Sequence, residues 1–289
     1  MVLRFFMLAG VFLFISCGTI ERDNPNDPGS DDYRGYQVIY PQSSSIPSSS
    51  SSTSSAVVVP SSSSMVSSSS KSSPSNSSNK CAGFVNGTKR EHYGEEKEQF
   101  CDSRDGKKYV YVEIDTQTWM AENLDYDVSG FCYKNDPANC VKYGRLYSWT
   151  EAMNLQPSCN TSSCSVNVKH RGVCPSGWHI PSDAEWTTLT DFVGENAGTE
   201  LKAENAWNSY YSLPSGSDTY GFAALPGGPP GSGPPFDNSN HIGDRGNWWS
   251  ATGIYDDYAY YRRMDFDKED IKSDFELKSY GYSVRCVKD

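Results

Sequence analysis

Residues 174–186 read CPSGWHIPSDAEW and contain the clearest helix start in the chain. Ser182 and Glu185 form an S-x-x-E capping box, in which each side chain satisfies a backbone N–H group that the helix leaves free. Apolar side chains follow at helical spacing at Trp186, Leu189 and Val193. The segment therefore predicts a helix with one buried face.

The segments around this helix predict strands and one further helix. Residues 109–114 alternate in polarity and 118–124 are extended, whereas 144–153 carry apolar side chains at helical spacing. Residues 214–247 are rich in glycine and proline, which predicts a long loop. A helical turn is expected at 201–207, and short strands at 222–225, 248–252, 258–266 and 282–287. The order indicates an α+β domain with two main helices, short antiparallel strands and a long Gly/Pro-rich loop.

Charge and cysteine usage narrow the class of protein. The chain has 289 residues and a formal net charge of −11, which repels phosphate backbones and excludes nucleic acid as a favoured partner. One of the nine cysteines, Cys17, stands apart, and the other eight favour a disulfide framework over zinc because no C-x-x-C occurs. These eight are Cys81, Cys101, Cys132, Cys140, Cys159, Cys164, Cys174 and Cys286.

The first residues have the pattern of a lipoprotein signal. Arg4 precedes an apolar run over 5–15 that is too short to span a bilayer. Ser16, Cys17 and Gly18 follow and resemble the bacterial lipoprotein box, which implies cleavage after residue 16 and lipidation of Cys17. An ordinary secretory signal cut elsewhere is the alternative. Gly18 favours the outer membrane over retention in the inner membrane.

The middle of the chain predicts a tether. Residues 17–42 form its first part, and serine occupies more than half of 43–79. Such a segment has too little apolar surface to offset chain entropy, so we expect a disordered linker. A short Cys-bounded segment, 80–101, and the main domain, 102–289, follow.

A series of motifs then resembles the Fibrobacter succinogenes major paralogous domain, over most of 102–289. The motifs are DSRDGKKY (102–109), QTWMAENL (117–124), KYGRLY (142–147), CPSGWHIPSDAEW (174–186), GFAALPGG (221–228), WWSAT (248–252) and SVRCV (283–287). The family is rich in lipoproteins with serine-rich linkers and has no established activity.

The helix opening at 181–186 and the closing Val-Arg-Cys-Val are also similar to formylglycine-generating sulfatase-modifying enzymes. That similarity implies a C-type-lectin-like architecture with a Cys174–Cys286 disulfide. The remaining pairs would then be local, and on spacing alone we expect Cys81–Cys101, Cys132–Cys140 and Cys159–Cys164. Eight cysteines allow 105 pairings, so these three rest on spacing only.

Motifs for catalysis are missing from the sequence. G-x-S-x-G, H-E-x-x-H and G-x-x-x-x-G-K-[ST] do not occur. His179 and Glu185 are the best candidates for a catalytic pair, but a structural role beside the helix start is favoured for both. We therefore favour binding over catalysis.

Aromatic residues make up 13% of the chain and supply candidates for a binding face. An exposed ring covers the apolar face of a sugar. The candidates are Trp207, Tyr210, Tyr211, Tyr255 and Tyr258. The other tryptophans are expected in the core: Trp119, Trp149, Trp178, Trp186, Trp248 and Trp249.

The end of the long loop carries oxygen ligands that would suit calcium. They are Asp237, Asn238, Asn240, Asp244 and Asn247. The calcium motifs of sugar-binding lectins and EF-hands are missing, so a solvated loop is favoured and no cofactor is predicted.

These patterns together predict a lipid-anchored protein of the outer membrane or cell surface. Its partners are the membrane, through the N-terminal lipid, and a polysaccharide or surface protein bound by the domain. One alternative is an extracytoplasmic enzyme on a sulfatase-modifying-factor-like fold. Another is a structural envelope protein without a ligand.

Overall fold

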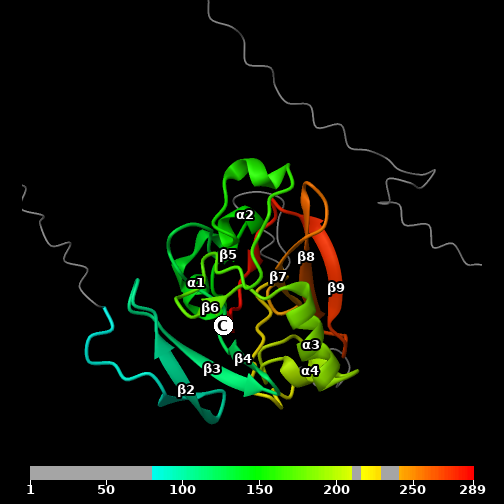
Figure 1. Ribbon diagram of the computed structural model, residues 1–289. Coiled ribbons are helices and arrows are strands. Elements are labelled where there is room, and N and C mark those ends of the chain that lie inside the picture. Colours follow the sequence, from blue (N-terminus) through cyan, green and yellow to red (C-terminus); the bar gives the residue numbers. More distant parts are fainter. Residues whose placement is uncertain (1–79, 210–215, 229–240) are drawn as a thin grey trace, which may run out of the picture. The chain divides into compact units, whose positions relative to one another are not determined.

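Two sheets of mostly antiparallel strands form the frame of the structure (Figure 1). The computed structural model describes residues 80–209, 216–228 and 241–289, so Cys17, the tether and the serine-rich segment lie outside the described residues. Within the described part of the chain, no helix is both long and apolar enough to cross a membrane.

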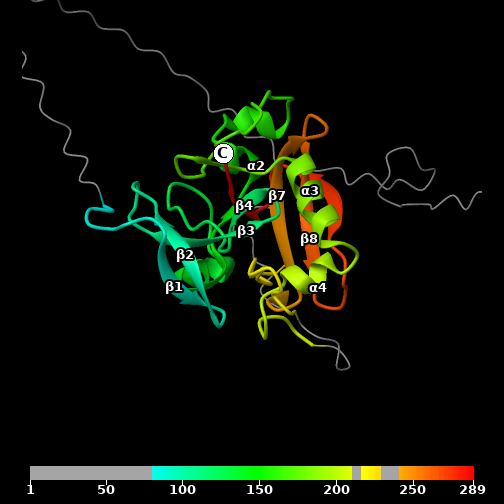
Figure 2. The same cartoon turned by 60° about the horizontal axis from the view of Figure 1, so that its bottom comes forward.

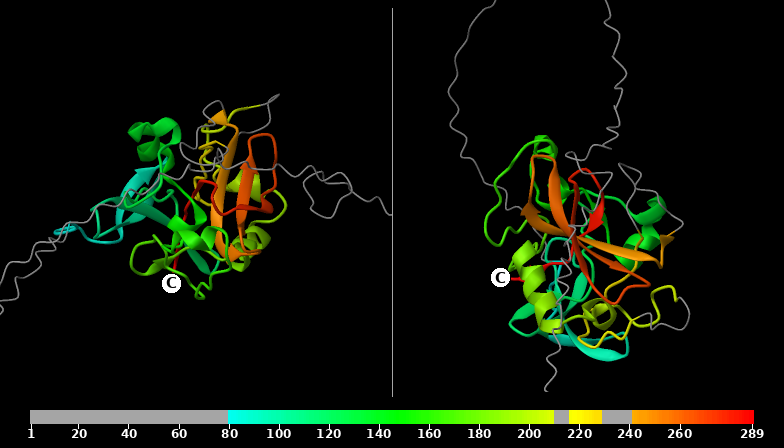
Figure 3. Two further views of the ribbon diagram at one scale, coloured as in Figure 1. Left: turned by 90° about the horizontal axis from the view of Figure 1, so that it is seen from above. Right: turned by 90° about the vertical axis from the view of Figure 1, so that its right-hand side faces the viewer.

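The first sheet contains, in hydrogen-bonded order, β1 (Thr88–His92), β2 (Glu95–Cys101), β3 (Lys108–Ile114), β4 (Gln117–Met120), β11 (Val287–Lys288) and β6 (Trp178–His179). The second contains β5 (Leu146–Tyr147), β10 (Tyr282–Ser283), β7 (Arg245–Gly253), β8 (Tyr258–Asp265) and β9 (Lys272–Leu277). Every pair is antiparallel except β10 with β7. Figure 3 shows the first four strands, coloured cyan to green, on the opposite side of the domain from the orange and red β7–β9.

Helices are few and short. They are α1 (Pro137–Tyr143), α2 (Trp149–Ala152), α3 (Asp183–Val193) and α4 (Ala197–Leu201), with 3-10 turns η1 (Tyr133–Asn135) and η2 (Pro157–Asn160). α3 lies across β7 and β8 (Figure 2). Its predicted capping box is confirmed, since the amide of Glu185 donates to Ser182 Oγ and the amide of Ser182 donates to Glu185 Oε2.

The predicted helix over 144–153 is wrong for its first half. Gly144 ends α1 with φ 75°, a conformation that favours glycine. Leu146–Tyr147 then pairs with β10 as β5. A second capping box at Ser148 starts α2, which has only four residues. The expectation of two main helices therefore reduces to α3, with 11 residues, beside shorter pieces.

Several strand boundaries also differ from the prediction. The expected strand over 282–287 divides into β10 and β11, and 222–225 makes only a single bridge, Lys202 with Ala224. The helical turn expected at 201–207 occurs earlier, as α4. β1, β2 and β9 were not predicted, and residues 80–101 form a hairpin whose second strand pairs with β3.

Most of the tryptophans lie in the core, as predicted. At most 5% of the surface is exposed for Trp119, Trp149, Trp178, Trp186, Trp248 and Trp249. Trp119 and Trp186 pack together under α3, whereas Trp149, Trp178 and Trp249 belong to a second apolar cluster. Burial of large aromatic side chains supplies much of the free energy that offsets chain entropy.

Four disulfides connect the described cysteines: Cys81–Cys101, Cys132–Cys140, Cys159–Cys164 and Cys174–Cys286. This is the expected pairing. Three of them close short segments, whereas Cys174–Cys286 spans 112 residues and joins the approach to β6 with the segment between β10 and β11. Both of its cysteines are fully buried.

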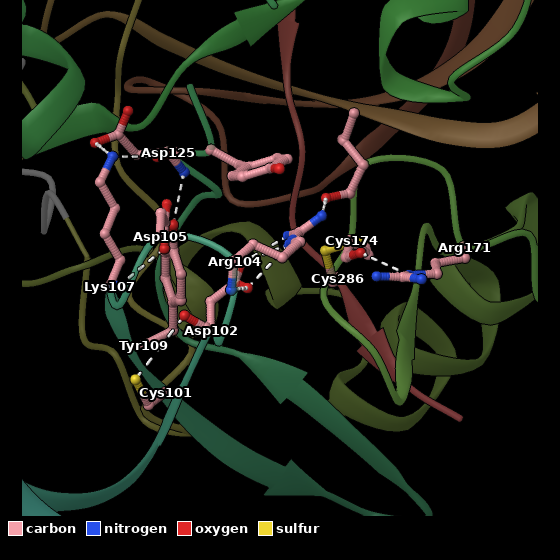
Figure 4. Close-up of polar contacts among 12 residues, drawn as sticks. Cys101, Asp102, Arg104, Asp105, Lys107, Tyr109, Asp125, Arg171, Cys174 and Cys286 are labelled. Carbon is pink, nitrogen blue, oxygen red and sulfur yellow. Dashed lines mark hydrogen bonds and ion pairs between the residues drawn. A yellow bond between two sulfur atoms is a disulfide. The ribbon is translucent and has the colours of Figure 1, made fainter. Parts of the chain in front are cut away.

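The turn between β2 and β3 is tied to the long-range disulfide (Figure 4). Arg104 donates from Nε and Nη2 to the buried carboxylate of Asp102, at 2.9 and 2.6 Å. Its Nη1 donates to the carbonyl of Val173 at 2.8 Å, next to Cys174. A bidentate pair of this kind is geometrically specific, so it fixes the turn against the Cys174–Cys286 region.

Candidate functional site

An exposed aromatic cluster lies at one end of β8 and β9. It consists of Tyr255, Tyr258, Tyr260 and Phe275. Tyr260 pairs directly with Phe275 across the two strands, and Tyr258 lies two residues before Tyr260 on the same face. The ring centre of Phe275 is 6.1, 5.8 and 6.4 Å from those of Tyr255, Tyr258 and Tyr260.

The cluster is exposed because α3 covers only the other end of this face. Arg262 lies on the same face as Tyr260 but is buried, since its guanidinium contacts the carboxylate of Asp183 and donates to Thr187 Oγ1 at 3.0 Å. Tyr258 and Tyr260, toward the end of this face that carries the cluster, are half-buried. Tyr255 remains 59% exposed and Phe275 44% exposed.

A groove of about 550 Å³ adjoins the cluster. Residues 163–170 form one wall and 251–255 the other, and the groove is further lined by Ile180, Ser182, Glu185 and Lys278. Tyr255 belongs both to the groove and to the aromatic cluster. The two features therefore form one continuous surface, which we call the aromatic groove.

Hydrogen bonds and a disulfide hold the walls of the aromatic groove. The Cys159–Cys164 disulfide closes the base of the first wall, and the His170 ring contacts the carbonyl of Met153 at 2.8 Å. Lys278 Nζ donates to Asp256 O at 2.6 Å and thereby anchors the turn after β7. Burial lowers the pKa of the Lys278 ammonium. The groove is thus formed by fixed segments, which reduces the entropy lost on binding.

Glu185 brings a permanent negative charge to the groove. Burial alone would raise its pKa, but hydrogen bonds from His179 and Ser182 outweigh burial and bring the pKa to about 2. Oε1 lies 2.8 Å from His179 Nε2, and Oε2 accepts from Ser182 N and Oγ at 2.8 Å. A carboxylate held ionised in this way is a poor proton donor at neutral pH, and His179 is 1% exposed.

The rings of the cluster are mutually perpendicular. The interplanar angle is 90° between Tyr255 and Tyr258, 83° between Tyr255 and Phe275, and 82° between Tyr258 and Phe275. Edge-to-face packing of this kind is favourable for the rings themselves. It also means that no two of these three rings form a flat platform.

Comparison with known families assigns the domain. The sequence profile of the Fibrobacter succinogenes major domain matches residues 112–288, more than half of the chain. The chain belongs to this family. Comparison with curated proteins and with solved structures finds no match. The matched part, which we call the family domain, begins within β3, contains the aromatic groove and leaves the β1–β2 hairpin outside.

Two of the five predicted binding residues meet in the family domain. Tyr255 and Tyr258 lie together in the aromatic cluster, whereas Tyr210 and Tyr211 lie outside the described residues. Trp207 is a core residue, which corrects its interpretation as an exposed ring. It is 5% exposed, and its Nε1 donates to the carbonyl of Ala224 at 2.9 Å.

The loop residues considered for calcium do not come together where the family domain is described. Asp237, Asn238 and Asn240 lie outside the described residues. Asn247 is buried, whereas Asp244 accepts from Asn208 at 2.7 Å and faces a cavity that also contains Arg245 and Arg263. The described residues contain no group of three or more His, Cys, Asp or Glu side chains placed for a metal ion.

Tyr260 and Phe275 complete the cluster but were not among the predicted binding residues. The segment 271–277 alternates, with Ile271, Ser273, Phe275 and Leu277 on one face. That pattern predicts a strand, but it does not say which strand is its neighbour. Only the cross-strand register shows that Phe275 meets Tyr260.

Proposed function

We propose that the family domain binds a single extracellular polysaccharide chain along the aromatic groove. The observation that carries this proposal is the cluster of four rings, two of them exposed and two half-buried, that continues directly into the groove. Monomeric proteins rarely leave several large aromatic rings together on the surface without a binding role.

The chemistry of the groove suits a sugar chain. An aromatic ring covers the C–H face of a pyranose, while tyrosine hydroxyls and nearby polar groups accept and donate hydrogen bonds. Ser182, Asn167 and Lys169 supply polar groups along the groove. Its volume of about 550 Å³ lies within the range of small-molecule sites.

The ring angles favour a soluble chain over a crystalline surface. A flat face of packed chains needs coplanar rings, whereas Tyr255, Tyr258 and Phe275 are perpendicular to one another. Such rings contact a single bent chain from different sides. We therefore expect binding to soluble polysaccharide and little retention on crystalline cellulose.

We further propose a C-type-lectin-like architecture and a lipid anchor on Cys17. The long-range Cys174–Cys286 disulfide, which connects the approach to α3 with the last strands, supports the first. The Ser-Cys-Gly at 16–18 supports the second, and four disulfides fit an oxidising compartment outside the cytoplasm. The serine-rich segment would then hold the domain away from the outer membrane.

Affinity electrophoresis tests the binding proposal. The full chain is run through gels that contain xylan, glucomannan or mixed-linkage β-glucan, together with Tyr255→Ala and Phe275→Ala variants. We expect retardation by at least one polysaccharide and its loss in both variants. Phe192→Ala, which removes another exposed ring on α3, is the matched control. Retardation by none of them, or equal retardation of all variants, contradicts the proposal.

Metabolic labelling tests the anchor. Cells that produce the protein are supplied with a labelled fatty acid, and we expect label on the wild-type chain and none on Cys17→Ser. Label on the Cys17→Ser variant, or an unlabelled wild-type chain that leaves the membrane fraction, contradicts lipidation at Cys17.

A further inference from the structure

A second cavity, of about 560 Å³, lies between the β1–β2 hairpin and the family domain. Arg90, His92 and Tyr93 line it from the hairpin, Lys108 lines it from the start of β3 ahead of the family match, and Asn123 and Lys142 line it from the family domain. It shares no lining residue with the aromatic groove. Seven of its sixteen lining residues, between Arg90 and Tyr109, lie outside the family match.

The hairpin is held firmly enough to form a wall. Lys97 on β2 and Asp218 form an ion pair at 3.4 Å, with both side chains only 5% exposed. Arg90 Nη2 on β1 contacts Glu122 at 2.6 Å. A buried pair loses more than a surface pair when it is separated, so the hairpin and the family domain keep a fixed spacing.

Two of the three carboxylates that line this cavity are paired, and the third, Glu91 on β1, is exposed to solvent without an ion pair among the described residues. Two of the cations that line the cavity also have no carboxylate partner in the described structure. Glu122 is paired with Arg90, and Asp125 is paired with Lys107 at 2.5 Å (Figure 4). In contrast, the ammonium groups of Lys108 and Lys142 contact only the rings of Phe84 and Tyr143, each at 4.9 Å, and have no carboxylate partner in the described part of the chain.

A further positive charge lies behind the cavity wall. Arg285 is fully buried, and its partners are the side-chain oxygen of Asn123 and the carbonyls of Phe222 and Ala223, without a carboxylate among the described residues. Burial, followed by the charges of Lys97, Arg90 and Arg285, lowers the pKa of His92 to about 4. His92 is therefore uncharged at neutral pH and adds no positive charge of its own to the cavity.

We propose that this cavity binds a small anionic ligand, of the size of a monosaccharide or disaccharide, through a carboxylate, sulfate or phosphate group. Lys108 and Lys142 supply the free charges at its rim, and Arg285 supplies a fixed charge behind Asn123. The chain as a whole has a net charge of −11 and repels anions. The unpaired cations at this cavity would therefore attract an anionic ligand to this place on the surface. The site is independent of the aromatic groove and does not rest on its function.

Titration calorimetry on the full chain tests this site with four compounds that differ only at C6: galactose, galacturonate, galactose 6-sulfate and galactose 6-phosphate. We expect saturable binding of at least one charged compound and none of galactose. The Lys108→Gln/Lys142→Gln double variant should weaken that binding about tenfold. Lys89→Gln, on the same hairpin but outside the cavity wall, should leave it unchanged.

Three results would overturn the proposal. They are an affinity for galactose equal to that for its charged analogues, no saturable binding of any of the four compounds, or a loss of affinity in Lys89→Gln equal to that in the double variant. Tyr255→Ala distinguishes this site from the aromatic groove. We expect this variant to bind the anion as the wild type does. Loss of anion binding in Tyr255→Ala would place the anion in the aromatic groove and contradict a site behind the hairpin. The same variant reports on the polysaccharide proposal separately.

Discussion

Arg285 and Asn123 form a buried pair that joins four of the sequence motifs. Nε and Nη2 of Arg285 both donate to Oδ1 of Asn123, at 3.0 and 2.8 Å, and Trp248 Nε1 donates to the same oxygen at 2.8 Å. Arg285 also donates to the carbonyls of Phe222 and Ala223. Oδ1 of Asn123 therefore links the segment after β4, strand β7 and the segment before β11. Its hydrogen bonds stabilise a buried guanidinium that has no carboxylate partner within the described structure.

Asn123→Ala should therefore be strongly destabilising. The change leaves three buried N–H groups, two of them on a charged group, without their acceptor, which costs about 3 kcal/mol or more. Thermal unfolding should shift downward by about 10 °C. Asn139→Ala is the control, because that amide makes a single partly buried bond to Tyr133 O at 2.9 Å. Similar losses in the two variants would show that the pair is not a centre of stability.

Glu185 should make the stability depend on acid pH. Its folded-state pKa, about 2, lies below the ordinary value of 4.5. The stabilisation is therefore complete above pH 4.5 and is lost as the pH falls toward 2. We expect this loss to be about 1–2 kcal/mol, because partial exposure of the carboxylate screens part of the shift. Glu185→Gln should lack this component.

Urea unfolding at pH 6 and pH 3 measures the effect. The difference in unfolding free energy between wild type and Glu185→Gln should be smaller at pH 3 than at pH 6, and an unchanged difference contradicts the assignment. Glu151→Gln at pH 6 reports the cost of weakening a capping box alone, since Glu151 occupies the same position in the box that starts α2.

Local signals in the sequence predicted local structure well. The α3 capping box and the buried tryptophans follow from spacing and residue type, and α3 forms as expected. The predicted helix over 144–153 is wrong in its first half because Leu146–Tyr147 pairs as a strand with β10, more than 130 residues away in the sequence. Helical spacing cannot reveal such a competing partner.

The candidate site was predictable only in part for the same reason. Tyr255 and Tyr258 are close in sequence, but Phe275 joins them only through the β8–β9 register. By residue type, Trp207 is as good a candidate for an exposed ring as these tyrosines. Its indole is nevertheless buried, and its Nε1 donates to the carbonyl of Ala224. The cavity behind the hairpin depends on the Lys97–Asp218 contact across 121 residues, which no local pattern encodes.

The four disulfides should contribute unequally to stability. In the chain-entropy model, the Cys174–Cys286 bridge, with a separation of 112 residues, contributes about 4–5 kcal/mol, whereas Cys159–Cys164, with a separation of five, contributes about 2 kcal/mol. Paired Cys→Ala variants of each bridge, compared by urea unfolding, check this order. Equal losses would contradict the entropic ranking and point to packing of the buried sulfurs.

The outer edge of β9 is protected by its own side chains. β9 is the last strand of its sheet, and alternate amides along it, of Phe275 and Leu277, donate to the carboxylates of Asp274 and Glu276, each at 2.9 Å. The alternation places these amides on the side away from β8. Unpaired edge amides recruit strands from other molecules, so the two carboxylates occupy donors that would otherwise promote association.

Asp274→Ala/Glu276→Ala should therefore increase self-association of the folded protein. Freed amides beside the exposed Phe275 ring offer both the hydrogen bonds and the apolar surface that edge-to-edge pairing needs. Sedimentation velocity over a concentration series measures the change, and we expect dimers or larger species at concentrations where the wild type sediments as a smaller species. Asp191→Ala/Glu195→Ala removes the same charge from an exposed part of the chain away from β9. Equal association in both double variants would attribute the effect to net charge and contradict protection of the edge, because only the first variant exposes the amides of β9.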